Sequence, residues 1–246
     1  MGAEWIGFQR YELKYHIPRS MIPKIRELAR PHVEHDVHCR DLPGKAYTVR
    51  SIYFDSKDLG FYFEKLDSVC VRKKLRVRTY NLPRDRAAAF LEIKRKIGRL
   101  GRKERLMLDL EKVNDALNGK DPQETLPDLG NGERQMLDRF RFNLKTSRLD
   151  PVVLVVYERE AFIGRTNDRW RMTLDQDIRS LINPSMDQIF EEEQLQAFED
   201  RYFVLELKFD DFMPRWMTNL VSRLNLRPQA YSKYVKGIDA WTPHAR

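Results

Sequence analysis

The sequence predicts an α+β fold: a closed antiparallel β-barrel that forms a tunnel with a charged interior, with helices packed outside. The first observation is the segment 203–209, where four apolar side chains alternate with Val204, Glu206 and Lys208. Alternate residues of a strand face opposite sides, so one face of this segment is apolar and the other is ionic. Other segments repeat this alternation of apolar and ionic residues, and amphipathic helices between them can cover the apolar faces. The ionic faces then meet one another, and a barrel is the simplest closed arrangement.

Six further segments place ions at every second position of a predicted strand. These ions are Glu12 and Lys14, Arg76 and Arg78, Glu92 and Lys94, Lys103 and Arg105, Arg159 after Tyr157, and Arg169, Arg171 and Asp175. A surface sheet would usually intersperse Ser, Thr, Gln and mixed charges, which supports the barrel. Alternating strands also form open sheets with one solvated face, and the pattern alone leaves that alternative open.

The remaining elements follow from hydrophobic periodicity and turn residues. Strands are predicted over 10–17, 47–55, 69–80, 88–96, 103–110, 151–160, 169–179 and 202–210. Helices are predicted over 21–29, 57–66, 111–117, 133–144, 214–224 and 232–237. The segments 33–44, 121–132 and 182–201 are predicted as loops, the last with weak helical character. No linker or composition break is visible, so 1–246 is predicted as a single domain.

Turn and capping residues mark several of these boundaries. Pro18 ends the first strand, and Pro31 closes the helix that follows it. Ser56 is the predicted cap of helix 57–66. Gly98 and Gly101 make a hairpin between two strands.

Composition narrows the class of partner. The chain has 246 residues, a formal net charge of +8, and 33% charged residues, above the usual share of about 25%. A basic balance predicts a polyanionic partner: nucleic acid, an anionic membrane, or phosphate-rich small molecules. No apolar run is long enough for a membrane span, and no signal peptide is visible. Cys39 and Cys70 fit no metal spacing, so a reduced, cytoplasmic protein is the default expectation.

The ionic positions carry more cations than carboxylates. The cations are Lys14, Arg76, Arg78, Lys94, Lys103, Arg105, Arg159, Arg169, Arg171 and Lys208, and the carboxylates are Glu12, Glu92, Asp175 and Glu206. Buried like charges need counter-ions, which a bound polyanion would supply. Arginine suits phosphate through its bidentate fork, and the carboxylates suit Mg²⁺ or Mn²⁺. Such a combination is typical of phosphoryl transfer.

Eight short motifs, in order along the chain, resemble a known family. They are RYELKY at 10–15, SIYFD at 51–55, LRVRT at 75–79, LEIK at 91–94, VYER at 156–159, RMTLD at 171–175, LELK at 205–208 and SKYV at 232–235. Each motif alone is weak, but the ordered set resembles the VTC domain of the triphosphate tunnel metalloenzyme, or CYTH-like, superfamily. The hydrolytic branch of that superfamily opens with Glu-x-Glu-x-Lys. Arg10 stands at the first Glu position here, which argues against that branch.

The resemblance implies roles for individual residues. The positions that match the family's triphosphate-holding cations are Lys14, Arg76, Arg78, Lys94, Lys103, Arg159 and Arg171. Tyr157 matches a phosphate-contacting tyrosine, Glu206 the metal-binding glutamate, and Lys233 a lysine at the tunnel mouth. Arg169 and Lys236 are further substrate-binding candidates.

The activity implied by the resemblance is that of a polyphosphate polymerase. Such an enzyme transfers the γ-phosphate of ATP to a growing polyphosphate chain with Mn²⁺ or Mg²⁺. Its partners are ATP, polyphosphate and inorganic phosphate or pyrophosphate, with no nucleic acid. Two alternatives stay open: a hydrolase of tripolyphosphate or nucleoside triphosphates, and a non-catalytic polyanion-binding module.

Several of these residues also have simpler interpretations. Glu12 and Glu92 are better explained as salt-bridge partners of Lys14 and Lys94 than as metal ligands. Arg105, Arg169, Lys96 and Lys208 are as readily exposed as directed into a tunnel. His32, His35 and His38 are spaced like metal ligands, but their segment is polar and has no helix signals, so a metal role is disfavoured.

Overall fold

The computed structural model describes residues 10–81, 87–98 and 100–241, and the chain divides into two compact units. Unit 1 consists of Met1–Tyr47, Glu158–Ile178 and Glu199–Tyr231. Unit 2 consists of Thr48–Tyr157, Arg179–Phe198 and Ser232–Arg246. Strands β7 (Asp150–Gly164) and β8 (Arg171–Ile182) contribute residues to both units. We describe each unit by itself.

Unit 1 contains an antiparallel sheet with one ionic face. Strand β10 (Tyr202–Asp210) pairs with β1 (Arg10–Pro18) on one side and with β8 on the other, and β2 (Val33–His35) pairs with β7. The register sets Lys14 opposite Glu206, Glu12 opposite Lys208, and Lys208 opposite Arg171. Residues directly opposite one another lie on the same face. The sequence pattern and the register therefore agree on which residues share that face.

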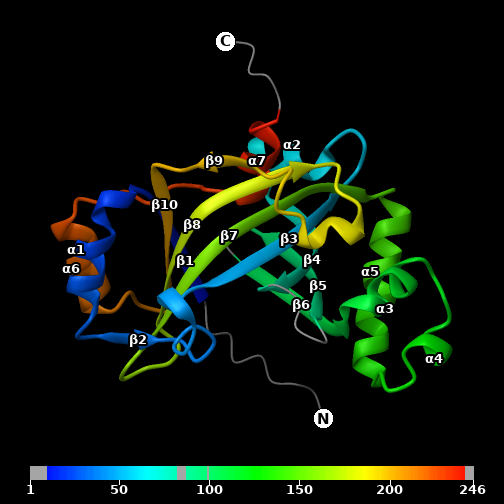
Figure 1. The fold of residues 1–246 in the computed structure, drawn as a ribbon, viewed down its shortest axis with the longest axis horizontal. Helices are drawn as coiled ribbons and strands as arrows, with labels where there is room; N and C mark the ends of the chain where they lie inside the picture. The colour runs from blue at the N-terminus through cyan, green and yellow to red at the C-terminus, as the bar shows by residue number, and fades with distance from the viewer. Residues whose placement is uncertain (1–9, 82–86, 99, 242–246) are drawn as a thin grey trace. The chain divides into compact units, whose positions relative to one another are not determined.

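The other face of the unit 1 sheet is apolar and is covered by two helices. Helices α1 (Ile22–Ala29) and α6 (Arg215–Arg223) contact each other in this unit (Figure 1). Their buried side chains join strand residues in one hydrophobic core that includes Ile25, Trp216 and Leu205. Helix α1 has a proline in its first turn, where no backbone N–H is needed, and its buried residues recur every three to four positions.

Unit 2 repeats this two-faced design. Strands β3 (Tyr47–Asp55), β4 (Val71–Tyr80), β5 (Ala88–Ile97) and β6 (Leu100–Asp109) form an antiparallel ladder in that order. One face buries residues such as Leu75, Leu91 and Ile93 against helices α3 (Leu110–Leu117) and α5 (Asn131–Thr146). The opposite face carries Arg76 and Glu92, which lie directly opposite each other.

Helix α2 (Gly60–Leu66) starts three residues later than the predicted 57–66. Leu59 adopts a left-handed conformation with φ of 55°, which prevents an earlier start. Ser56 does accept a hydrogen bond from the backbone N–H of Gly60, at 3.1 Å, but most of the capping comes from Asp55. Its carboxylate accepts from the backbone N–H groups of Phe61 and Tyr62, at 2.9 and 3.0 Å.

The predicted closed barrel is not formed. Within the described residues the strand order is β1-β10-β8-β7-β3-β4-β5-β6, and the two end strands, β1 and β6, are not paired with each other. Alternation fixes which face a side chain occupies, but closure depends on strand tilt and stagger, which a local pattern does not specify. The antiparallel sheet, its alternation and its covering helices are as predicted.

Three predicted loops contain short elements. The segment 33–44 includes β2 and the 3-10 turn η2 (Pro43–Lys45), and 121–132 includes α4 (Pro122–Thr125). The segment 182–201 includes η3 (Met186–Phe190) and β9 (Gln196–Glu199), and η1 (Arg19–Met21) precedes α1. Elements of three to five residues carry too little periodicity to be predicted. Across the described ranges, every helix is too short or too polar to span a bilayer.

Within unit 2, helix α7 (Lys233–Asp239) packs closely against β7 and β8. This packing gives a testable prediction. A Cβ at Gly237 would lie 3.0 Å from a methyl of Val155 and 3.3 Å from Ser180 Cβ. Gly237→Ala should therefore lower the free energy of unfolding by about 1–2 kcal/mol, because crowding outweighs the gain in helix propensity. Urea unfolding followed by circular dichroism measures it.

The matched control is Gly132→Ala on α5, where the added methyl meets no atom within 4 Å. This variant should be neutral or slightly stabilised. Equal stabilisation of both variants would show that α7 is not closely packed.

Candidate functional site

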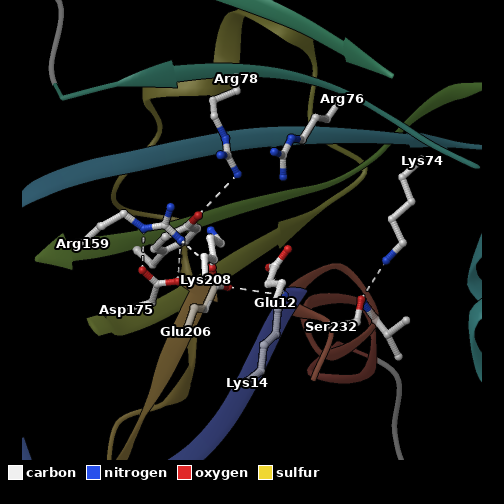
Figure 2. A network of polar contacts seen from close by, with 12 residues as sticks. Glu12, Lys14, Lys74, Arg76, Arg78, Arg159, Asp175, Glu206, Lys208 and Ser232 are labelled. Atoms are coloured by element: carbon white, nitrogen blue, oxygen red, sulfur yellow. Dashed lines mark hydrogen bonds and ion pairs between the residues drawn. The ribbon is translucent and has the colours of Figure 1, made fainter. Parts of the chain in front are cut away.

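Glu206 is the centre of an ion cluster on the ionic face of unit 1. We define the Glu206 cluster as Glu12, Lys14, Arg159, Asp175, Glu206 and Lys208. The Glu206 carboxylate, 4% exposed, lies 3.3 Å from Lys14 Nζ, 2.9 Å from Lys208 Nζ and 3.5 Å from Arg159 Nη2 (Figure 2). The three cations of the cluster face three carboxylates, Glu12, Asp175 and Glu206, so its formal charges balance. A phosphate oxygen that binds here would replace one of these carboxylate contacts.

Arg159 is held mainly by Asp175. Its guanidinium donates two hydrogen bonds to the fully buried Asp175 carboxylate, at 2.6 and 2.7 Å. This bidentate geometry is the strongest arrangement of an arginine with a carboxylate. Glu12 lies 3.3 Å from Lys14 and is more exposed, which agrees with its predicted role as a salt-bridge partner.

The two remaining unit 1 candidates lie at the start of β8. Arg171 is exposed and sits opposite Lys208 in the strand register, so it shares the ionic face. Arg169 precedes the strand, is half-exposed, and forms an ion pair with Asp210. Arg169 therefore does not belong to the Glu206 cluster.

Unit 2 carries a second group of cations, built around the buried carboxylate of Glu92. We define the Arg76 cluster as Tyr53, Lys74, Arg76, Arg78, Glu92, Tyr157 and Lys233. Glu92, 1% exposed, accepts from Arg76 Nε at 2.6 Å and Lys103 Nζ at 3.0 Å, and lies 3.2 Å from Arg105 Nε. Its predicted partner Lys94 is exposed and faces Lys74 and Lys103 across the ladder instead.

The surrounding cations control the ionisation of Glu92. Burial alone would raise the pKa of this carboxyl, but Arg76, Arg78 and Lys103 together outweigh burial and hold the pKa well below its usual range. Glu92 is therefore an anion throughout the physiological range. It acts as the internal counter-ion of Arg76, and this contact leaves it poorly placed as a metal ligand.

Arg78 and Arg76 also donate to hydroxyl groups on neighbouring strands. Arg78 donates to Ser51 Oγ at 2.9 Å and to the Tyr157 hydroxyl at 3.3 Å, and Arg76 donates to the Tyr53 hydroxyl at 3.0 Å. These neutral partners orient the guanidinium groups without cancelling their charge. Arg78 and Tyr157, to which the family resemblance assigns phosphate contacts, are thus in contact with each other.

Sequence reasoning missed Lys74 as a member of this cluster. Its ammonium donates to Ser232 Oγ at 2.8 Å (Figure 2). It also lies 4.9 Å from the centre of the Tyr234 ring. The signal was present, because Lys74 precedes Arg76 and Arg78 by even numbers of residues and so shares their face. Tyr53 on β3 was also missed. It lies directly opposite Arg76 in the strand register.

Helix α7 gives its two lysines different surroundings. Lys233 is 7% exposed and lies 4.7 Å from the centre of the Tyr157 ring. Lys236 has a side chain 53% exposed and lies 4.0 Å from Asp239. The Tyr234 hydroxyl anchors the helix by donating to the buried carboxylate of Asp55. Lys233 is thus fixed inside the cluster, and Lys236 is solvated.

A metal ion would find few ligands at these clusters. Among the described residues no three His, Cys, Asp or Glu side chains are grouped closely enough to hold an ion. His35 bonds to Glu160 at 3.0 Å and His32 stacks on Trp216, so these two histidines contact different partners. Asp175 accepts two hydrogen bonds from Arg159, whereas Glu206 contacts three separate cations.

Comparison with known proteins decides the family. The sequence-family model of the VTC domain matches residues 9–242 of this chain. The chain belongs to the VTC family. This confirms the resemblance drawn from the sequence motifs, and the matched range includes strands of both units.

A curated relative is the vacuolar transporter chaperone complex subunit 4 of Schizosaccharomyces pombe (strain 972 / ATCC 24843). It is 26% identical over 278 aligned residues, which cover 96% of this VTC chain. The chain spans 38% of the length of that relative. A solved Hippeastrum protein, HpAC1, described as having a dominant triphosphatase activity, matches with a TM-score of 0.46 and 12% identity over 94% of this chain and 97% of its own. That score is too low to support an argument.

Tyr53 offers a spectroscopic test of the Arg76 cluster. Burial would raise the pKa of Tyr53, but the positive charges of Arg76, Arg78 and Lys233 outweigh burial and lower the pKa below its ordinary value near 10. The difference in phenolate absorbance between the wild type and Tyr53→Phe should therefore titrate with a midpoint below pH 10. Added triphosphate should move this titration to higher pH, because a bound anion offsets the cations.

Tyr62→Phe provides the internal reference for this titration. Burial and the hydrogen bond to Asp239 raise the pKa of Tyr62 to about 12. Its difference curve should lie near that pH and should not respond to triphosphate. A Tyr53 curve centred at or above pH 10 would contradict the proposed field of the cluster.

Proposed function

We propose that this VTC chain is an ATP:polyphosphate phosphotransferase. It would transfer the γ-phosphoryl group of ATP to the terminal oxygen of a polyphosphate chain and release ADP. The observation that carries the proposal is the cation excess of the Arg76 cluster. Lys74, Arg76 and Arg78 share one face of the sheet with Glu92, and Lys233 of α7 lies over the Tyr157 ring. Membership of the VTC family, for which the sequence motifs implied this activity, supports the proposal.

The chemistry asks for charge neutralisation and alignment more than for a covalent nucleophile. Arg76 and Arg78 donate through planar forks that match phosphate oxygens, and their tyrosine partners hold the forks in place. Preorganised donors cost little reorganisation when charge develops on the transferred group. Lys233 supplies a further positive charge beside Tyr157.

The proposal includes a divalent cation, Mn²⁺ or Mg²⁺, with Glu206 as its protein ligand. One carboxylate is a small donor set, but Mg²⁺ is often bound through one or two carboxylates together with substrate phosphates and water. The residues of the Glu206 cluster fit that arrangement, because Lys14 and Lys208 can exchange Glu206 for phosphate oxygens. When bound, the ion would offset the negative charge of the phosphate groups. Arg159 keeps its own partner, Asp175, throughout.

The product of ATP turnover distinguishes polymerase from hydrolase. Incubation of the wild-type chain with ATP and Mn²⁺ should yield ADP and phosphate chains that lengthen with time. Products are resolved by length on a gel. Orthophosphate as the sole phosphate product at every time point would assign the chain to the hydrolases, and absence of turnover would favour a polyanion-binding module.

Glu206→Gln tests the metal ligand. The change keeps the size and removes the charge, so turnover should fall roughly 100-fold or more, since metal charge stabilisation is worth several kcal/mol. Triphosphate binding should persist because the cations remain. Glu12→Gln, which removes a more exposed carboxylate from the same cluster, should change turnover only a few-fold. Normal Mn²⁺-dependent turnover by Glu206→Gln would exclude it as the ligand.

Lys233→Ala and Lys236→Ala form a matched pair on α7. The loss of Lys233 should weaken polymer binding about tenfold and flatten its salt dependence, since one charged phosphate contact disappears. The loss of the solvated Lys236 should have little effect. Polyphosphate binding at several salt concentrations measures both. Equal losses for the two variants would contradict a specific role of Lys233.

A further inference from the structure

Unit 1 contains a pocket that is distinct from the Glu206 cluster. It has a volume of about 630 Å³ and lies among α1, β2 and the end of β7. Glu160 and Phe162 line it, and both alternate along β7 with Arg159. They therefore face the helix-covered side of the sheet, whereas Arg159 faces the ionic side. The volume is within the range of about 300–1,000 Å³ that is usual for small-molecule sites.

The floor of the pocket is a buried, fully engaged carboxylate. The Glu160 side chain is 4% exposed and accepts from Arg26 Nε and Nη2, at 2.9 and 2.7 Å. Its other oxygen bonds to His35 Nε2 at 3.0 Å, and the His35 ring lies 4.6 Å from the ring of Phe162. Arg26, His35 and Phe162 are thereby held in fixed positions around the floor. This preorganisation is what a binding site requires and what a solvated surface lacks.

The side chains at the rim of the pocket carry more positive charge than negative charge. Glu34 is shared by Arg40 at 3.4 Å and Arg165 at 3.3 Å. Both distances exceed the 2.7–2.9 Å or so of strong charge-assisted bonds, so either arginine can exchange Glu34 for another anion. Arg30 also lines the pocket, and its side chain has no ion-pair partner among residues 10–81, 87–98 and 100–241. The lining therefore holds four guanidinium groups and three carboxylates, and one of those carboxylates, Glu27, is paired with Lys24.

We propose that this pocket binds a small phosphate-bearing anion, separately from the Arg76 and Glu206 clusters. Arg30, Arg40 and Arg165 supply bidentate donors for phosphate oxygens, a role in which arginine is better than lysine. Phe162 supplies an apolar surface at the floor that can contact the rest of an organic ligand. The inference rests on the pocket alone and does not depend on the polymerase activity.

Calorimetric titration of the full chain with inorganic triphosphate, and separately with ATP, tests the proposal. We expect the double variant Arg30→Ala/Arg165→Ala to lose one class of site that the wild type has, with an affinity loss of at least about tenfold. Arg78→Ala should retain that class. The matched control is Arg201→Ala, an exposed cation of unit 1 outside the pocket, which should bind as the wild type does.

The two probes distinguish what the pocket recognises. Loss of ATP binding alone in the double variant would show that the ligand needs an organic part on Phe162, and loss of both would show that phosphate suffices. Urea midpoints confirm that the variants are folded, and Arg30→Lys/Arg165→Lys gives a second test that keeps the charge. Wild-type titration curves from Arg30→Ala/Arg165→Ala with both probes would overturn the proposal.

Discussion

Buried guanidinium groups need a counter-charge, and in the Arg76 cluster a single carboxylate provides it. Glu92 contacts Arg76, Lys103 and Arg105 on the face that the core does not cover. Two further cations of that face, Lys74 and Arg78, contact hydroxyl groups. Hydroxyl contacts orient a charge without neutralising it, so the face is stable as a folded surface and still attracts anions. The proposed affinity for phosphate chains depends on this imbalance.

In unit 1 too, buried carboxylates are the counter-charges of the cations, but two of them share this role. There Glu206 meets three cations and Asp175 is fully used by Arg159. A carboxylate among several ammonium and guanidinium groups can exchange partners when a phosphate oxygen arrives, which suits a metal ligand better than Glu92 does. In each unit the strands that carry these ions bury their other face under helices, and the resulting cores fix the ionic side chains in register.

Much of the architecture was predictable because strand alternation is a local property. Segments such as 47–55 and 202–210 were predicted with the boundaries of β3 and β10, and Glu206 and Arg78 were placed on ionic faces. Barrel closure was not predictable, since it depends on strand geometry along the whole sheet. Partner choice was also out of reach: Glu92 pairs across strands with Arg76 instead of with Lys94 beside it. The different surroundings of Lys233 and Lys236 required the packing of α7 against Tyr157.

A crystal structure of the chain soaked with triphosphate and Mn²⁺ tests the account most directly. The account predicts phosphate density in contact with the guanidinium groups of Arg76 and Arg78, and an anomalous manganese peak within bonding distance of a Glu206 oxygen. Ordered triphosphate that contacts neither arginine, or manganese bound away from Glu206, would contradict it.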